Sequence, residues 1–165
     1  MIKGVDFLST ARRLVPEGRE IPPRDPEAAP SSGIPEEDLR TAAGRTYYAL
    51  FLTLRDKLDP VGDIFLWDRS VHGEISRLLR ECYQRNPQAM SRIKAAHDAL
   101  ANLYSWRTEG DYLRPQRKSW SASAIDLCIK SAEAQILNVE NWKNNQIKEL
   151  QELYRRLPPK PIPRG

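Results

Sequence analysis

The chain has no proline between Pro35 and Pro60, and in that interval apolar side chains recur every three or four residues. This spacing places them on one face of an α-helix, and the two prolines set its limits. The acidic residues Glu36, Glu37 and Asp38 suit the positive end of a helix dipole. The pattern predicts one long helix with a continuous apolar stripe, formed by Leu39, Ala43, Thr46, Tyr47, Leu50, Leu54 and Leu58.

The opposite side of this helix carries a second stripe, made of Thr41, Arg45, Tyr48, Leu52 and Arg55. A helix with two occupied faces lies either at the centre of a bundle or against a partner. Arginine binds phosphate groups and tyrosine stacks on nucleobases, so Arg45, Tyr48 and Arg55 of this stripe, together with Arg107, form a candidate surface for RNA if they are contiguous in the fold.

Four further segments show helical periodicity, over residues 5–15, 69–85, 87–109 and from Ser119 or Ser121 to Leu157. The last segment would form one helix, roughly 50 Å long. We expect its second half, beyond residues 144–145, to project and to pack on another element or subunit. No strand pattern appears, so the sequence predicts an all-α fold, an antiparallel bundle of about five helices with a long C-terminal helix.

Six prolines lie between Pro16 and Pro35, a stretch that we expect to form a mobile loop inside a single domain of residues 1–157. A plain connector explains this composition, and a proline-rich ligand is the alternative. Residues 158–165 are again rich in proline and are expected to form a disordered tail.

Composition narrows the classes of function. The net charge of +4 and the pI near 9.2 permit nucleic-acid binding without requiring it.

With no long apolar run and no leader-like start, we expect a cytoplasmic protein that does not enter a membrane. Cys82 and Cys128 match no metal spacing and are expected to be reduced, buried side chains. The chain has only two histidines, and we expect neither a metal nor another cofactor.

The residues that could still form a catalytic or binding site are arginine, histidine and tyrosine side chains near helix ends. Arg107 falls in line with an apolar stripe, where an arginine is costly unless it is paired or lines a cleft. Asp111 and Tyr112 follow it, so Arg107 either ties the helix to the next loop or serves a site. Arg92 and His97 have the spacing of a phosphate-binding cation and a proton-transferring imidazole, although five residues turn about 140° around a helix. A boundary position beside the core is the alternative for His97.

Four other aromatic or imidazole side chains bear on a site. Tyr47 belongs to the apolar stripe and is expected in the core, whereas His72 is expected at the surface or as a capping group at the start of its helix. Trp106 and Trp120 flank a charged loop, either as packing anchors or as stacking platforms.

Two segments resemble signatures of HEPN domains (higher eukaryotes and prokaryotes nucleotide-binding). Residues 38–51, DLRTAAGRTYYALF, are similar to the second-helix signature, in which an arginine precedes a Tyr-Tyr-Ala-x-Phe run. Residues 103–112, LYSWRTEGDY, are similar to the Leu-x-x-x-Arg-x-x-Ala-Asp-Tyr signature. His72 stands where these domains often carry a histidine. The resemblance covers about residues 5–140.

This resemblance implies a four- or five-helix bundle, usually a homodimer, with a cleft at the dimer interface that takes RNA or nucleotides. Many such domains are metal-independent ribonucleases, often toxins paired with a nucleotidyltransferase antitoxin. Their catalytic motif is an arginine followed four to six residues later by a histidine. Five residues after Arg107 stands Tyr112, whereas Arg92 and His97 match the motif's spacing at an earlier place in the chain.

The candidate catalytic residues are therefore Arg107, Tyr112, Arg92 and His97. The candidate nucleotide-binding residues are Arg45, Tyr48, Arg55 and Asp111. The alternative function is a non-catalytic dimeric protein-interaction module, which the missing histidine after Arg107 and the long final helix favour.

Overall fold

The computed structural model describes residues 3–17, 33–60, 62, 71–86, 90–112 and 120–158. Within these ranges the chain forms six helices and no strand: α1 (Gly4–Leu14), α2 (Glu36–Leu58), α3 (Val71–Arg85), α4 (Ser91–Tyr112), α5 (Ala122–Glu140) and α6 (Asn144–Arg156). The predicted all-α bundle is confirmed. Most of the expected loop 16–35 and of the expected tail 158–165 lies outside the described residues.

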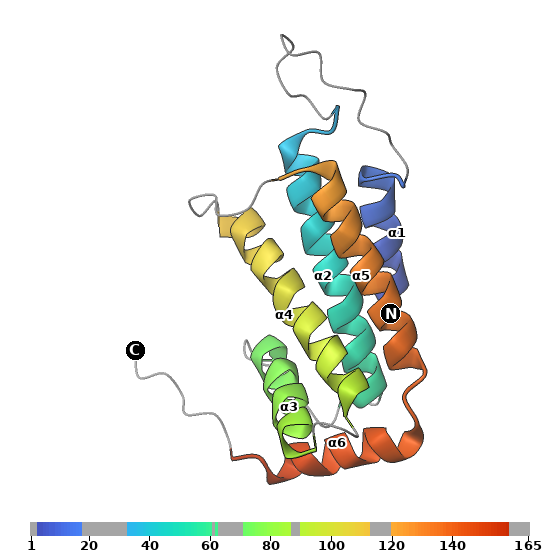
Figure 1. Ribbon diagram of the computed structural model, residues 1–165, viewed down its shortest axis with the longest axis vertical. Coiled ribbons are helices and arrows are strands. Elements are labelled where there is room, and N and C mark those ends of the chain that lie inside the picture. The colour runs from blue at the N-terminus through green and yellow to red at the C-terminus, as the bar shows by residue number, and fades with distance from the viewer. Residues whose placement is uncertain are drawn as a thin grey trace.

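Helix α2 is the centre of the bundle. It packs against α1, α4 and α5 along its length and also contacts α3 and α6 (Figure 1). Side chains on several of its faces are buried, including Leu52 of the second stripe. At the approach of α1, a side chain on Gly4 would collide with the carbonyl oxygen of Ala49 and with Thr53 Oγ1. Of the two explanations for a helix with two occupied faces, the structure supports the central position.

The apolar side chains form two adjoining clusters. One joins α2 to α3, α4 and α6 around Tyr47, and the other joins α1, α2 and α5 around Ile125. Leu8 and Trp106 pack against both clusters. The two cysteines are buried thiols that form no disulfide with each other, as expected.

The prediction of one continuous C-terminal helix is wrong. Helix α5 ends at Glu140, where Asn141 Nδ2 donates to the carbonyl oxygen of Leu137 at 2.8 Å. Trp142, between the two helices, is only 3% exposed. Helix α6 then crosses the lower end of the bundle beside α3 (Figure 1). The element that was expected to project therefore closes the core of its own chain, and it buries Leu150 and Leu153.

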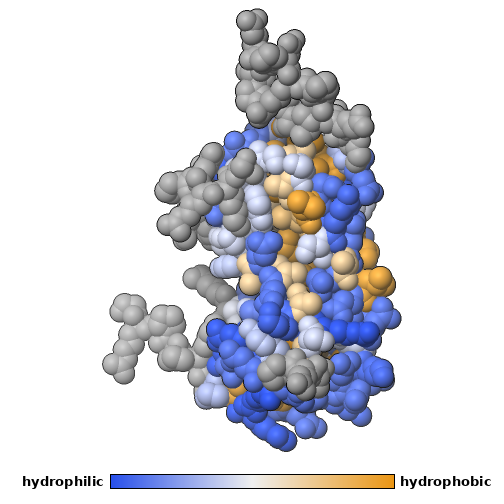
Figure 2. All heavy atoms as spheres, viewed as in Figure 1, coloured by the Kyte–Doolittle hydropathy of each residue, from blue (hydrophilic) through white to orange (hydrophobic). Residues whose placement is uncertain are grey.

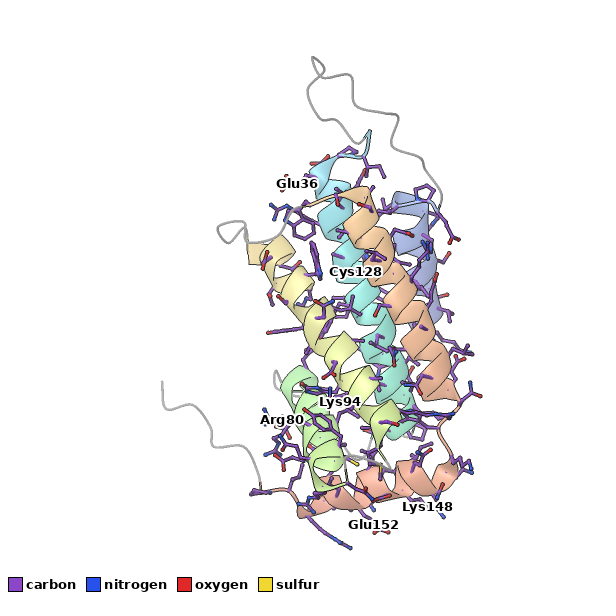
Figure 3. The ribbon with its side chains drawn as sticks, in the orientation of Figure 1. Glu36, Arg80, Lys94, Cys128, Lys148 and Glu152 are labelled. Atoms are coloured by element: carbon purple, nitrogen blue, oxygen red, sulfur yellow. The ribbon has the colours of Figure 1, made fainter. Side chains whose placement is uncertain are left out.

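We expect Leu150→Ala to lower the free energy of unfolding by about 2–5 kcal/mol, since Leu150 is fully buried and its truncation leaves a cavity. Urea denaturation followed by circular dichroism measures the change. Lys148→Ala is the matched control, because Lys148 is exposed on the same helix at the lower end of the molecule (Figure 3). Equal, small effects of the two substitutions would contradict the packing of α6.

Candidate functional site

Arg107, near the C-terminal end of α4, lies over two tyrosine rings. Its Cζ is 4.8 Å from the ring centre of Tyr48 and 5.3 Å from that of Tyr47. Its Nε donates to Asp111 Oδ2 at 3.0 Å. Only 18% of the Arg107 side chain is exposed. The ring faces and the carboxylate together stabilise a cation that falls in line with an apolar stripe.

A histidine adjoins the same tyrosines. The hydroxyl of Tyr47 and Nδ1 of His72 share a hydrogen bond of 2.6 Å, and the His72 ring stacks on Phe51 with centroids 4.1 Å apart. Tyr47 is 1% exposed, so its expected core position is confirmed. The expectation of a surface or capping His72 is wrong, because packing of α3 on α2 brings this residue against the aromatic cluster.

Burial keeps both partners of this hydrogen bond neutral near pH 7. Burial lowers the pKa of His72, and the positive charge of Arg107 lowers it further. Burial likewise raises the pKa of the Tyr47 hydroxyl. When Nδ1 of His72 carries the proton, it donates to the tyrosine oxygen and leaves Nε2 as an acceptor. The pair can thus present a proton acceptor beside Arg107.

A cavity of about 380 Å³ lies between α3 and α4 and includes Tyr47 and His72 in its lining. Arg80 lines this cavity, is exposed and forms no ion pair with any other described residue (Figure 3). Arg77 donates to Glu74 and to the carbonyl oxygen of Pro158, while its buried Nε has no hydrogen-bond partner among the described residues. These two arginines give the cavity a cationic rim.

The other walls of this first cavity are aromatic and apolar. Tyr104, 47% exposed, lies with its ring centre 5.7 Å from that of Tyr47, and Leu100 and Ala101 add an apolar surface. A flat ring with a negatively charged substituent matches this combination of walls.

A second cavity, of about 330 Å³, lies between α2 and the end of α4. It is lined by Thr41, Gly44, Tyr48 and Asp111 together with two arginines, Arg40 and Arg45. Arg45 is exposed, lies over the ring of Phe7 at 5.3 Å and has no ion pair in the described ranges. The sequence-predicted residues Arg45, Tyr48, Arg107 and Asp111 are thus brought together.

Arg40 is held more firmly than Arg45. It pairs with Glu36, donates to the carbonyl oxygens of Glu109 and Gly110, and lies 5.0 Å from the ring centre of Trp120. Trp120 in turn meets Trp106 edge to face, with centroids 5.2 Å apart. Of the two roles open to these tryptophans, packing anchors are what the structure shows.

Arg107 stands between the two cavities, since Tyr47 lines the first and Tyr48 lines the second. We refer to Tyr47, Tyr48, His72, Arg107 and Asp111 as the Arg107 site. With Arg80 beyond one side and Arg45 beyond the other, the site forms a band of cations and aromatic rings over three helices.

Three other candidate residues lie away from this site. Arg55 pairs with its neighbour Asp56 and lines neither cavity. Arg92 is exposed beside a third cavity, near the starts of α4 and α6. His97 contacts Asp98 at 3.2 Å and the ring of Tyr83. Arg92 and His97 share no contact or cavity among the described residues, in keeping with their angular separation on α4. The fourth candidate, Tyr112, ends α4, and its side chain is not described.

The sequence interpretation missed the residues that α3 contributes. Gly73, Ser76, Arg77 and Arg80 all line the first cavity. They follow the spacing i, i+3, i+4 and i+7, which places them on one helix face. That spacing is visible in the sequence, but only the packing of α3 against α4 shows that this helix face lines a cavity.

No described helix is long and apolar enough to cross a membrane. In the same ranges, no three His, Cys, Asp or Glu side chains cluster so that they could hold a metal ion. No protein-family model, curated protein or solved structure matches the chain. The assignment of function therefore depends on the geometry of the Arg107 site and on the sequence motifs that supply it.

We expect His72 to titrate below 6.5, the ordinary pKa of its side chain, because burial and Arg107 both disfavour the imidazolium form. Removing the cation by Arg107→Ala should raise this pKa. NMR titration of the imidazole ring measures both values, and a His97→Gln background leaves His72 as the only histidine. A pKa at or above 6.5 that does not respond to Arg107→Ala would contradict the geometry.

The same shift has a consequence for stability. A histidine with a depressed folded-state pKa stabilises the fold fully above its unfolded pKa. That contribution falls as the pH drops from near 6.5 toward the folded-state pKa. His72→Gln should therefore reduce the loss of folding stability that protonation of His72 causes at acidic pH.

Proposed function

We propose that this protein binds RNA or nucleotides at the Arg107 site, as the HEPN domains that its motifs resemble are expected to do. One observation carries the proposal: a guanidinium group lies over two tyrosine rings between two cavities that each hold further arginines. Arginine recognises phosphate through paired N–H groups, and aromatic rings stack on bases.

The charges around the site are available to a ligand. Asp111, the partner of Arg107, is 45% exposed, so a phosphate can replace its carboxylate. Arg45 and Arg80 have no carboxylate partner among the described residues and flank the site on opposite sides. A single strand running from one cavity to the other would pass these arginines in turn, and each phosphate contact would release a counterion.

A cleaving activity would use His72 in this arrangement. Metal-independent cleavage of RNA needs a group that takes the proton of the attacking 2′-hydroxyl. His72 lines the first cavity and is fixed by Tyr47, so its Nε2 can accept that proton while Arg107 holds the phosphate. His97 is directed toward Asp98 and Tyr83, outside both cavities.

We expect Arg107→Ala to weaken the binding of a fluorescent single-stranded RNA and to reduce the slope of its salt dependence by about one, since it removes the central phosphate contact. Fluorescence anisotropy at several salt concentrations, in EDTA, measures the affinity and its salt dependence. The control is Arg92→Ala, which removes the same charge from an exposed position away from the site. Equal affinities of wild type and Arg107→Ala would contradict the proposal.

The same samples, resolved on a denaturing gel, report cleavage. If wild type cuts RNA, we expect His72→Gln and Arg107→Ala to abolish cleavage and His97→Gln to retain it. Loss with His97→Gln alone would place the working site at the Arg92–His97 spacing instead.

A second candidate function is a dimeric interaction module, which the outer face of α5 favours. Leu127 and Leu137 are 68% and 61% exposed, and Ala134 is exposed between them. Figure 2 shows apolar residues along the face on which α5 lies, with hydrophilic residues on either side and over α6. A second copy of the chain would bury this face.

We expect Leu127→Lys to shift the protein from dimer to monomer in sedimentation equilibrium if this second function holds, because a charge would then enter the interface. Glu140→Lys, an exposed change at the end of the same helix, should leave the association unchanged. A wild type that stays monomeric at high micromolar concentration would exclude the α5 dimer.

A further inference from the structure

Gly44 is an unfavourable residue for its position in helix α2. It lies in the interior of α2, where glycine is a poorer helix former than any residue except proline. A Cβ atom built on Gly44 would meet no described atom within 4 Å. Packing within the described chain therefore gives no reason for glycine at this position.

Gly4 provides the contrast. A side chain there would collide with Ala49 and Thr53 of α2, so the close approach of two helices explains that glycine. The space above Gly44 is instead part of the second cavity, between α2 and the end of α4. The missing side chain leaves room for something outside the described chain.

The surroundings of this space favour an anion. Arg45, exposed and without an ion pair in the described ranges, lines the cavity beside Gly44. Tyr48 lines it as well and carries the guanidinium of Arg107 over its ring. Asp111 is the one carboxylate in this lining, and it is already paired with Arg107.

We propose that Gly44 is a recognition residue, and that the sugar–phosphate backbone of single-stranded RNA lies against α2 in the room that its absent side chain leaves. This inference rests on the proposed RNA-binding function and deepens it. It assigns one phosphate to the second cavity, which Arg45 lines and where Tyr48 carries Arg107 over its ring. It also implies that a larger side chain at position 44 would obstruct the strand.

A second copy of α2 is the competing occupant, since glycine also lets two helices approach closely. The charge of Arg45 opposes it. Crossing two copies at Gly44 would bring Arg45 of one chain, exposed and without an ion pair in the described ranges, close to Arg45 of the other, and like charges at such a contact destabilise it. A nucleic-acid backbone would meet the same arginine with opposite charge.

The experiment compares wild type, Gly44→Ala, Gly44→Gln and Ala95→Gln. Ala95 is exposed on α4 and lines neither cavity, so its variant controls for a similar enlargement elsewhere. Affinity for a fluorescent 12-nucleotide single-stranded RNA is measured by anisotropy at low salt. Thermal unfolding and sedimentation equilibrium are measured on the same samples.

We expect stability and binding to change in opposite directions. Gly44→Ala should raise the unfolding midpoint by about 2–4 °C, because alanine favours the helix and meets no clash. It should weaken RNA binding several-fold, and Gly44→Gln should weaken it about tenfold or more, with Ala95→Gln equal to wild type. A residue with only a structural role would not separate the two readouts.

Three outcomes would overturn the inference. If Arg107→Ala loses binding while both Gly44 variants bind like wild type, the proposed function stands and the role of Gly44 fails. If the Gly44 variants change only the sedimentation behaviour, a second copy of the chain occupies the space. If wild type binds no RNA even at low salt, the proposed function fails and the role of Gly44 fails with it.

Discussion

The burial of α2 on several sides is the constraint on which the rest of the structure depends. Because α1, α4 and α5 all pack against this one helix, its side chains must fit several neighbours at once. Ala42, Ala43 and Ala49 are fully buried and allow close packing. Between residues 40 and 52, the positions that stay exposed or half-buried are Arg40, Thr41, Gly44, Arg45 and Tyr48.

The cation of Arg107 is compatible with this packing because two ring faces and a partly exposed carboxylate stabilise it together. A tyrosine can bury its edges in the core and still offer a π surface to a guanidinium. The site consequently needs no buried carboxylate, and its only acidic member, Asp111, remains in contact with solvent. Under the proposed function, an anionic ligand would meet a cation whose carboxylate partner is partly exposed.

Periodicity within one helix was the part of this structure that the sequence could predict. The limits of α2, the core position of Tyr47 and the alignment of Arg107 with an apolar stripe all follow from spacing along the chain. The break at residues 141–143 did not follow, since no proline or glycine marks it and the apolar rhythm resumes at Ile147 and Leu150. The hydrogen bond between Tyr47 and His72 joins residues 25 positions apart, and the contribution of Arg77 and Arg80 depends on how α3 packs against α4. Such contacts depend on how the helices are placed relative to one another. The spacing of residues within a single helix does not predict that placement.

Tyr47 belongs to two systems at once, as a fully packed member of the main cluster and as the ring that carries Arg107 and fixes His72. A substitution at Tyr47 would change the contacts with Arg107 and His72 and the packing of the core at the same time. Under the proposed function, ligand preference could change at the rim, through the exposed side chains of Arg45, Arg80 and Tyr104. We therefore expect related chains to keep Tyr47 and the residues that it contacts, and to vary the exposed side chains at positions 45, 80 and 104.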